Sequence, residues 1–293
     1  MTDLRLDGRV AVVTGTGRGL GRTWAQALAG RGATVVLVGR DPALVRETDL
    51  ADQIRATGGQ AHPELGDVTD MAAMQALATR VLAAHGRVDI LVNNAGMTRD
   101  RSFAKLDMAD FRAVLEGNLT GAAQATAAFW PAMLAQGYGR VVFLTSSSGL
   151  AGHFGQAGYA AAKMGLVGLM QVLGLEGGPK GVHVNCLSPV GATEMNAGLL
   201  PEAVAARFTP DRLVPGMLLL ASEAAPNRMV LMGGGGSFEL ADLRFTPGLL
   251  ADTPEALLAG LATLTAAQGA IRPANAMTQI ELELAALGRN DVI

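Results

Sequence analysis

Short apolar runs rich in β-branched residues alternate with longer stretches of helical periodicity through the first two thirds of the chain. Parallel strands buried on both faces have unbroken apolar runs of this kind, and helices with one apolar face cover them. The alternation predicts an α/β fold, a single Rossmann-like, doubly wound parallel sheet with helices on both faces. The predicted strands are Val10–Thr14, Thr34–Val38, a third strand before Asp67, Ile90–Asn93, Arg140–Thr145 and Gly181–Leu187, and the predicted helices are Leu20–Ala29, Pro42–Ala56, Met71–Ala84, Met108–Leu134 and Gly158–Leu175.

The chain beyond Pro189 is less regular. Because no Pro- or Ser-rich linker interrupts it, we predict one catalytic domain over residues 1–238, with a substrate segment over 190–213. A helical C-terminal extension over 239–293 is expected to pack on the same domain. The elements predicted here are a helix over Leu213–Ala225, a last strand over Met229–Met232, a four-glycine turn over Gly233–Gly236 and a helical segment over Thr253–Leu287.

The composition narrows the class of protein. The 293 residues are 49% hydrophobic and 17% charged, which is ample apolar material for a compact core. A net charge of −3 with dispersed Lys and Arg makes nucleic acid an improbable partner. No uninterrupted run of 18 apolar residues occurs and the first residues are polar, so we expect neither a membrane span nor a signal peptide. A single cysteine, Cys186, and four dispersed histidines predict a reducing cytoplasm and no metal site.

A glycine-rich segment joins the first predicted strand to the first predicted helix. Glycines there let the backbone turn tightly and approach a pyrophosphate, whose charge meets the free N–H groups at the helix start. The spacing is TGxxxGxG and not the more frequent GxGxxG, and tight packing alone would also use such glycines. The residues expected to contact a dinucleotide are Thr14, Gly15, Gly17, Arg18, Gly19, Leu20 and Gly21.

Two further segments lie at predicted strand ends, where α/β sheets bind ligands. Asp67 and Val68 follow the third strand, and the carboxylate could accept a hydrogen bond from an adenine amino group or simply cap a helix. Asn93 ends the fourth strand, and the following Asn94, Ala95 and Gly96 are small enough for backbone contact with a ribose. An ordinary Asn/Gly turn is the alternative.

A tyrosine and a lysine, Tyr159 and Lys163, are spaced i and i+4 on a predicted helix, so both project from one face. The lysine charge is expected to lower the pKa of the tyrosine toward working pH, as a general acid or base requires. Ser146 follows the fifth strand and could bind a carbonyl oxygen or merely cap a turn. Asn118 interrupts an apolar helical stretch, as a solvated side chain or an internal hydrogen-bonding site.

Together these residues resemble the short-chain dehydrogenase/reductase family over residues 5 to about 190. The resemblance implies an oxidoreductase that moves a hydride between a nicotinamide and an alcohol or carbonyl carbon. It implies that Tyr159 gives the proton, Ser146 polarises the carbonyl, Lys163 binds the nicotinamide ribose and lowers the tyrosine pKa, and Asn118 orders a water. The motifs that carry it are TGxxxGxG at 14–21, NNAG at 93–96, Asn118, Ser146 and Tyr159-x-x-x-Lys163.

A narrower resemblance is to the (3R)-hydroxyacyl-CoA dehydrogenase unit of multifunctional β-oxidation enzymes, through 97–103, 155–159 and the tail around 253–256. The chain departs from that pattern at Gly39, where the subgroup has an acid, so its CoA substrate is not carried over. An NAD-dependent hydroxyacyl-CoA dehydrogenase and a catalytically silent regulatory protein are the alternatives. The resemblance also implies cofactor contacts after the sixth strand, at Pro189, Val190, Gly191 and Thr193, where the family often has Pro-Gly.

The end of the second strand predicts NADP(H) in preference to NAD(H). An acid there would hold the ribose hydroxyls and repel a 2′-phosphate, but the chain has Gly39 and Arg40, and Arg18 offers a second cation. In the alternative, Asp41 turns inward to hold the ribose.

Substrate contacts are expected from Ser146, Tyr159, His153, Phe154 and the segment Val190–Phe208, either as a lid or as a surface loop. Small residues along the Tyr159 helix permit close approach of another helix. By resemblance this favours a homodimer or homotetramer, and close packing within one subunit is the alternative.

Overall fold

The computed structural model describes residues 4–43, 49–192, 202–266 and 268–288. The chain divides into two compact units, Met1–Leu240 and Ala241–Ile293.

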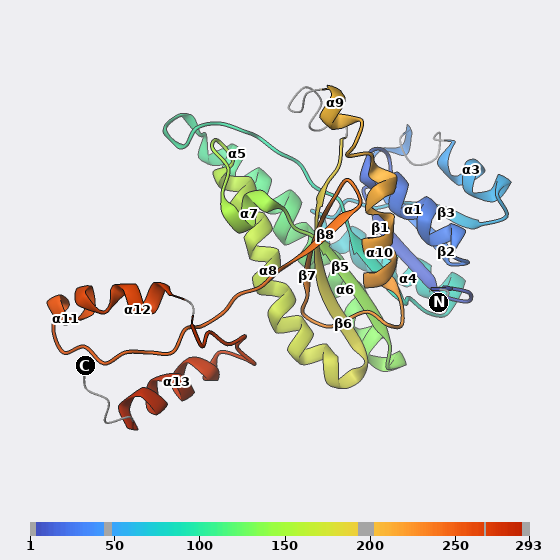
Figure 1. Cartoon of the computed structure of the whole chain (residues 1–293). Helices are drawn as coiled ribbons and strands as arrows, with labels where there is room; N and C mark the ends of the chain where they lie inside the picture. The colour runs from blue at the N-terminus through green and yellow to red at the C-terminus, as the bar shows by residue number, and fades with distance from the viewer. Residues whose placement is uncertain (1–3, 44–48, 193–201, 267, 289–293) are drawn as a thin grey trace. The chain divides into compact units, whose positions relative to one another are not determined.

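The first unit is built on an eight-stranded sheet in the order β3-β2-β1-β4-β5-β6-β7-β8 (Figure 1). The first seven strands are parallel, and the register places Val12 beside both Val36 and Leu91. The predicted doubly wound α/β fold is confirmed. The strands are β1 (Val10–Thr14), β2 (Thr34–Gly39), β3 (Gln60–Leu65), β4 (Ile90–Asn93), β5 (Gly139–Leu144), β6 (Val182–Val190), β7 (Val230–Gly234) and β8 (Ser237–Ala241).

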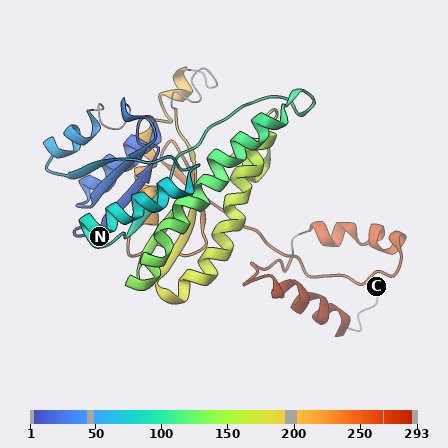
Figure 2. The same ribbon diagram turned by 180° about the vertical axis from the view of Figure 1, so that it is seen from behind.

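Helices cover both faces of this sheet (Figures 1 and 2). The predicted helix over Pro42–Ala56 is described over its second half as α3, because residues 44–48 lie outside the described part. Two short helices, α7 (Ser147–Ala151) and α9 (Glu202–Ala205), lie in connections. One face carries α1 (Leu20–Gly30), α3 (Leu50–Ala56) and α10 (Val214–Ala221), and the other carries α4 (Met71–His85), α5 (Met108–Leu115), α6 (Gly121–Gln136) and α8 (Ala157–Gly177).

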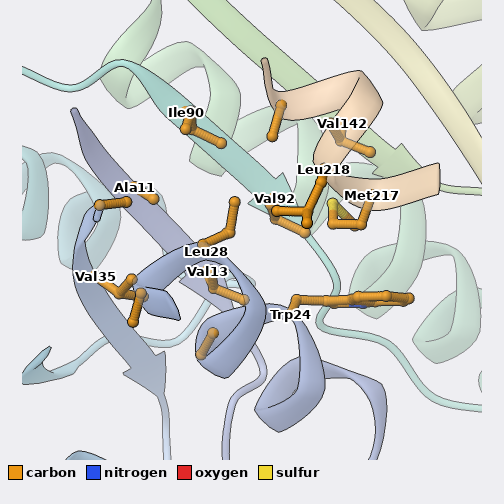
Figure 3. Packing of buried hydrophobic residues seen from close by; sticks show 14 of the residues in the cluster. Ala11, Val13, Trp24, Leu28, Val35, Ile90, Val92, Val142, Met217 and Leu218 are labelled. Carbon is orange, nitrogen blue, oxygen red and sulfur yellow. The ribbon is translucent and has the colours of Figure 1, made fainter. Parts of the chain in front are cut away.

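The core on the α1 side follows from the two-residue period of β1. Figure 3 shows Ala11 and Val13 of that strand against Trp24 and Leu28 of α1. The intervening residues of β1 point to the opposite face, and the whole strand is buried, as a central parallel strand requires. Burial of each Val or Leu side chain contributes on the order of 2 kcal/mol. This packing fixes the strand ends that carry the site.

The single helix predicted over Met108–Leu134 is wrong in one detail that bears on function. A π-helical turn over Glu116–Thr120 separates α5 from α6. Asn118 lies in this turn, and its amide donates to the Val114 carbonyl oxygen at 2.8 Å. Inserted π turns often occur at functional sites, and this one sets the position of Asn118.

The prediction that the sheet ends at Met232 is also wrong. Only Gly235 and Gly236, with φ of +60° and +90°, form the turn, and the chain reverses into β8. Two successive residues with positive φ suit the tight turn of a hairpin, so β8 runs antiparallel to β7. The ring of Phe238 packs where a Cβ at Gly216 would lie 2.5 Å from it, so that glycine makes room for β8. Helix α10 ends at Ala221 and not at Ala225, because Ser222 takes an extended conformation.

The second unit is not one helical segment. Its described residues form three helices, α11 (Pro254–Ala259), α12 (Leu261–Thr265) and α13 (Met277–Gly288). Gly269, with φ of +71°, and Pro273 lie between α12 and α13, where a continuous helix is disfavoured. Its larger apolar side chains are mostly exposed, among them Leu243, Leu250, Leu258, Ile271, Met277, Ile280, Leu284 and Leu287.

Candidate active site

The glycine-rich loop between β1 and α1 has the geometry of an anion site. Gly15 and Gly19 have φ of +73° and +59°, and a Cβ at Gly21 would lie 2.2 Å from the Gly15 carbonyl oxygen. The first turn of α1 has no acidic side chain, and its N-cap supplies no side-chain hydrogen bond. The positive end of the helix is therefore left for a ligand. This loop, with Gly17, Arg18 and Leu20 in it, fits the pyrophosphate of a dinucleotide.

The side chain of Asn94 holds this loop in place. Its amide donates to the carbonyl oxygens of Thr14 at 3.0 Å and Gly15 at 3.1 Å, and its Oδ1 accepts from the indole Nε1 of Trp24 at 3.2 Å. The backbone N–H groups of Asn94 and Ala95 donate to the Thr14 hydroxyl. The Asn94 side chain and these two N–H groups thus position the loop, so a ribose would be contacted through backbone carbonyl groups of 94–96. Trp24 was not predicted from the sequence, since nothing local signals a partner 70 residues away.

At the end of β2, Gly39 and Arg40 face the end of β3. Burial opposes ionisation of Asp67, but hydrogen bonds from Thr69 and the charge of Arg40 hold the pKa of Asp67 below its ordinary value. One carboxylate oxygen of Asp41 accepts from the Ala43 N–H at 3.0 Å, so this acid caps the following turn. Val68 packs against Gly121 at the start of α6. Arg40 is thus a cation at the edge where an adenosine ribose would bind.

Ser146 and Tyr159 are brought together by the packing of α7 on α8. Ser146 is the second residue after β5 and caps α7, accepting from the Ser148 N–H at 3.2 Å. A Cβ at Gly149 would lie 2.8 Å from the Met164 N, so a glycine lets the two helices approach. Burial raises the pKa of Tyr159, and a hydrogen bond with Ser146 opposes the rise. The tyrosine is thus a protonated phenol next to a hydroxyl.

Lys163 is buried one helical turn beyond Tyr159, on the same face. Its Nζ donates to the Leu144 carbonyl oxygen at 2.7 Å and lies 5.4 Å from the Tyr159 ring centroid. Burial lowers the pKa of Lys163 to about 8. The expected lowering of the tyrosine pKa by this lysine is not seen, because burial of the phenol dominates.

Asn118, in the π-helical turn, lies next to Lys163 and completes the group of Ser146, Tyr159 and Lys163. Its amide donates to the Met97 carbonyl oxygen at 2.7 Å, and its buried Oδ1 has no hydrogen-bond partner among the described residues. A Cβ at Gly96 would lie 2.4 Å from that oxygen and 3.7 Å from the Lys163 Nζ. Gly96 therefore leaves the space between an open acceptor and the buried ammonium group. An unpaired buried acceptor of this kind suits a bound water.

The residues expected to contact the substrate or the nicotinamide lie in different environments. His153 and Phe154 are exposed, with Phe154 89% accessible. Pro189 and Val190, expected after the strand, belong to β6 and pair with Gly233 and Gly234 of β7. The strand is longer than predicted because β7 offers partners. Gly191 follows it, whereas Thr193 and the other residues of 193–201 lie outside the described residues.

A metal site needs several ligating side chains close together, and a membrane span needs a long apolar helix. In the described part of the chain, no three His, Cys, Asp or Glu side chains gather as a metal site would require. Residues 157–180 are long and apolar enough to span a membrane by length and composition alone. This segment contains α8, whose buried residues pack on β6 and which carries Tyr159 and Lys163. We interpret it as a core helix.

Known proteins resemble this chain in sequence and in fold. The sequence model of a family described as short chain dehydrogenase matches residues 9–203. Peroxisomal multifunctional enzyme type 2 of Drosophila melanogaster is 42% identical over 228 residues, 75% of this chain and 38% of that enzyme. A 3-oxoacyl-[acyl-carrier-protein] reductase of Synechocystis is 37% identical over 200 residues, 68% of this chain and 81% of that protein.

Two solved structures superpose well. The full-length Drosophila multifunctional enzyme has a TM-score of 0.80 at 31% identity and covers 97% of this chain and 50% of its own. A gluconate 5-dehydrogenase from Burkholderia cenocepacia in complex with NADP and tartrate has a TM-score of 0.74 at 31% identity, covering 80% of this chain and 96% of its own. The chain thus spans half or less of the multifunctional enzyme that it matches.

A doubly wound sheet with a dinucleotide loop beside a Ser–Tyr–Lys group defines an NAD(P)-dependent oxidoreductase. The chain belongs to the short-chain dehydrogenase family.

Proposed function

We propose that the chain is an NADP(H)-dependent oxidoreductase that interconverts a secondary alcohol and a ketone, with Tyr159 as general acid and base. The observation that carries the proposal is one cluster at the carboxyl ends of β4 and β5. There the Tyr159 phenol meets the Ser146 hydroxyl, and the buried Lys163 and the open Asn118 oxygen lie beside Gly96. The bound dinucleotide supplies or accepts the hydride.

Side chains of this chain bind and protonate the substrate oxygen. In reduction, the Ser146 hydroxyl donates a hydrogen bond to the ketone oxygen, and Tyr159 Oη gives that oxygen a proton as charge develops on it. Burial keeps the phenol protonated at neutral pH, which supports the acid role. Lys163, with a pKa of about 8, is mostly cationic at neutral pH and stabilises the tyrosinate left after transfer. A water on Asn118 Oδ1 would return a proton toward Lys163.

The preference for NADP(H) is supported by charge at the end of β2. Arg40 is exposed there, Arg18 lies in the glycine loop, and Asp41 already accepts from Ala43. A guanidinium suits a 2′-phosphate, whereas Gly39 adds no repelling charge. We expect wild type to have the higher kcat/KM with NADPH, and Gly39→Asp to shift toward NADH. Gly30→Asp, an open site at the far end of α1, is the matched control. A wild-type preference for NADH contradicts the assignment.

The substrate is proposed as a ketone or secondary alcohol. A second candidate is an NAD-dependent (3R)-hydroxyacyl-CoA dehydrogenase, favoured by the likeness to the Drosophila enzyme along nearly the whole chain. A panel containing a simple ketone, a 3-oxoacyl thioester and a keto sugar acid separates these substrates by the loss of reduced-nicotinamide absorbance. Tight dinucleotide binding without turnover of any panel member would instead favour a regulatory protein.

We further propose a homodimer or homotetramer that uses the outer face of α8. Met164, Val172 and Leu175 are 36%, 52% and 43% exposed on that face, and Gly168 has open space where a Cβ would be. Apolar side chains on one helix face, with small residues between them, suit close helix packing. Val172→Glu should lower the mass measured by light scattering, and Lys180→Glu, at the turn after α8, should leave it unchanged.

A cytoplasmic location is proposed because the one cysteine, Cys186, is free and buried in the sheet. A fluorescent fusion of the whole chain tests it, and confinement to an organelle would contradict it.

A further inference from the structure

The loop from β4 to α5 is fastened to the turn that precedes α8. The N–H of Arg101 donates to the Gly155 carbonyl oxygen at 2.8 Å, and the Gln156 Nε2 donates to Asp100 Oδ2 at 2.7 Å. Gly155 has φ of +83°, and a Cβ there would lie 3.7 Å from the Arg101 carbonyl carbon. Two segments 56 residues apart in the chain thus meet just before α8, the helix that carries Tyr159.

The hydrogen bond to Asp100 fixes the orientation of the Gln156 amide. Only the NH₂ end of an amide can face a carboxylate, so Oε1 is turned away from Asp100. That oxygen is buried and has no hydrogen-bond partner among the described residues. Gln156 is the last residue before α8, where its side chain makes no capping hydrogen bond, and Tyr159 lies three residues further along the chain. The Gln156 amide is thus held by Asp100 three residues before Tyr159 in the chain.

The charge of Asp100 also affects the pKa of Tyr159. Burial raises the pKa of Tyr159, the Ser146 hydrogen bond opposes this, and the carboxylate of Asp100 raises it further. Lys163 Nζ lies 5.4 Å from the centroid of the Tyr159 ring, and two arginines flank Asp100 in the chain. Arg99 pairs with Asp110 of α5 at 3.1 Å, and Arg101 is exposed.

We propose that Asp100 and Gln156 are a positioning pair for the proton transfer. The hydrogen bond between their side chains holds the start of α8, and with it Tyr159, at the substrate carbonyl. The proposal rests on the proposed function and adds two residues that act through Tyr159 without touching the reacting atoms.

Exchanging the amide of Gln156 and the carboxylate of Asp100 tests the proposal. Gln156→Glu places two carboxylates together, so the bond breaks, and we expect kcat/KM for a ketone to fall about tenfold through misplacement of Tyr159. In the double variant Asp100→Asn/Gln156→Glu, an amide again donates to a carboxylate, with the roles exchanged, and most of the loss should be recovered. The dissociation constant for NADPH should not change. Gln171→Glu, at the other end of α8 where it still accepts from Arg228, is the matched control.

The single variant Asp100→Asn distinguishes the effect of the Asp100 charge from the positioning of Tyr159. The amide oxygen introduced by this substitution can still accept from Gln156, so kcat/KM should stay near wild type. Loss of the negative charge lowers the pKa of Tyr159, so the alkaline limb of the reduction profile should move to lower pH by at most about one unit. Asp110→Asn should not move it. An unmoved limb would show that the charge of Asp100 does not act on Tyr159, and a large fall of kcat/KM in Asp100→Asn, where the hydrogen bond is kept, would contradict positioning by that bond.

Trypsin provides a readout that does not depend on activity. It cleaves after Arg99, Arg101 and Lys105, all in the fastened loop, so Gln156→Glu should speed cleavage and the double variant should restore protection. Unchanged protection and unchanged kcat/KM in Gln156→Glu, or no recovery in the double variant, would overturn the pair and leave the proposed function standing. A wild type without turnover would overturn the proposed function, whatever the cleavage pattern.

Discussion

The two tyrosines of the chain lie at opposite ends of one sheet and differ in what surrounds them. Tyr138 precedes β5 at its amino end, with its ring between the guanidinium groups of Arg9 at 3.8 Å and Arg140 at 4.2 Å. Tyr159 lies beyond the carboxyl end of β5, beside Ser146. Burial raises the pKa of both phenols. A perturbed tyrosine pKa therefore does not by itself mark a functional residue.

The two ends of the sheet differ in the hydrogen-bond partners of the charged and polar groups around each tyrosine. At the amino end, Asp89 is buried and accepts from the Val10 N–H at 2.9 Å and from Arg9 and Arg87. The Arg140 guanidinium donates to backbone carbonyl oxygens, including that of Ser222 at 2.8 Å. At the carboxyl end, Asn118 Oδ1 is open beside the buried lysine. The charged groups at the amino end are thus paired within the fold, although Tyr138 Oη has no partner among the described residues, whereas the carboxyl end has an open acceptor next to a lysine.

The largest effect is expected from Tyr159→Phe. Only the hydroxyl is removed, so turnover should fall about 10²- to 10⁴-fold, the contribution of a general acid, while NADPH binding and stability are retained. Steady-state kinetics with one ketone measure it, with Tyr138→Phe as the control expected to keep full activity. Near-normal activity in Tyr159→Phe would remove Tyr159 from the mechanism.

Next is Asp89→Ala, which breaks the amino-end network. It leaves the Val10 N–H unpaired and two arginines without their buried partner, so we expect the free energy of unfolding to fall by about 3 kcal/mol. Urea unfolding measures the loss, and the folded fraction should keep its kcat. Asp52→Ala, an exposed acid paired with Arg55, should cost little. A loss of kcat in folded Asp89→Ala would contradict the separation of the two ends.

A smaller effect is expected from loss of β8. Truncation after Ser237 removes Phe238 from its place against Gly216, whereas truncation after Ala241 keeps it. The first truncation should be less stable than the second by about 2 kcal/mol, from the apolar surface of one aromatic ring. Urea unfolding and gel filtration compare the two, and folding or assembly should suffer more than kcat. Equal stability and oligomeric state would show that β8 is dispensable.

The smallest change is expected for the stability of Tyr138→Phe. The ring keeps its contacts with both guanidinium groups, and the Oη removed is buried without a hydrogen-bond partner among the described residues. The free energy of unfolding should stay within about 1 kcal/mol of wild type. A larger loss in urea unfolding would show that the hydroxyl is paired in solution.

The sequence was sufficient for features set by local spacing. The glycines from Gly15 to Gly21 and the i, i+4 pair Tyr159 and Lys163 are read within one turn or one helix, and the structure places them as expected. The parallel strands followed from unbroken apolar runs such as Val10–Thr14, because such runs require burial on both faces.

What the sequence did not predict depends on contacts between distant segments. The Trp24–Asn94 hydrogen bond spans 70 residues and the Gln156–Asp100 hydrogen bond 56, so no window of sequence contains either partner pair. The upward pKa shift of Tyr159 was missed for the same reason, since burial is a property of the packed fold. The hairpin to β8 was missed because four successive glycines hid which two have positive φ.

The most direct test of the central claim, that the carboxyl end carries hydride and proton chemistry, follows the label from NADPH deuterated at the transferred C4 position. With wild type and a ketone that it reduces, we predict one deuterium at the carbinol carbon of the product and none at its oxygen after exchange with water. A product without deuterium at that carbon, or no product from any ketone despite bound NADPH, would contradict the account.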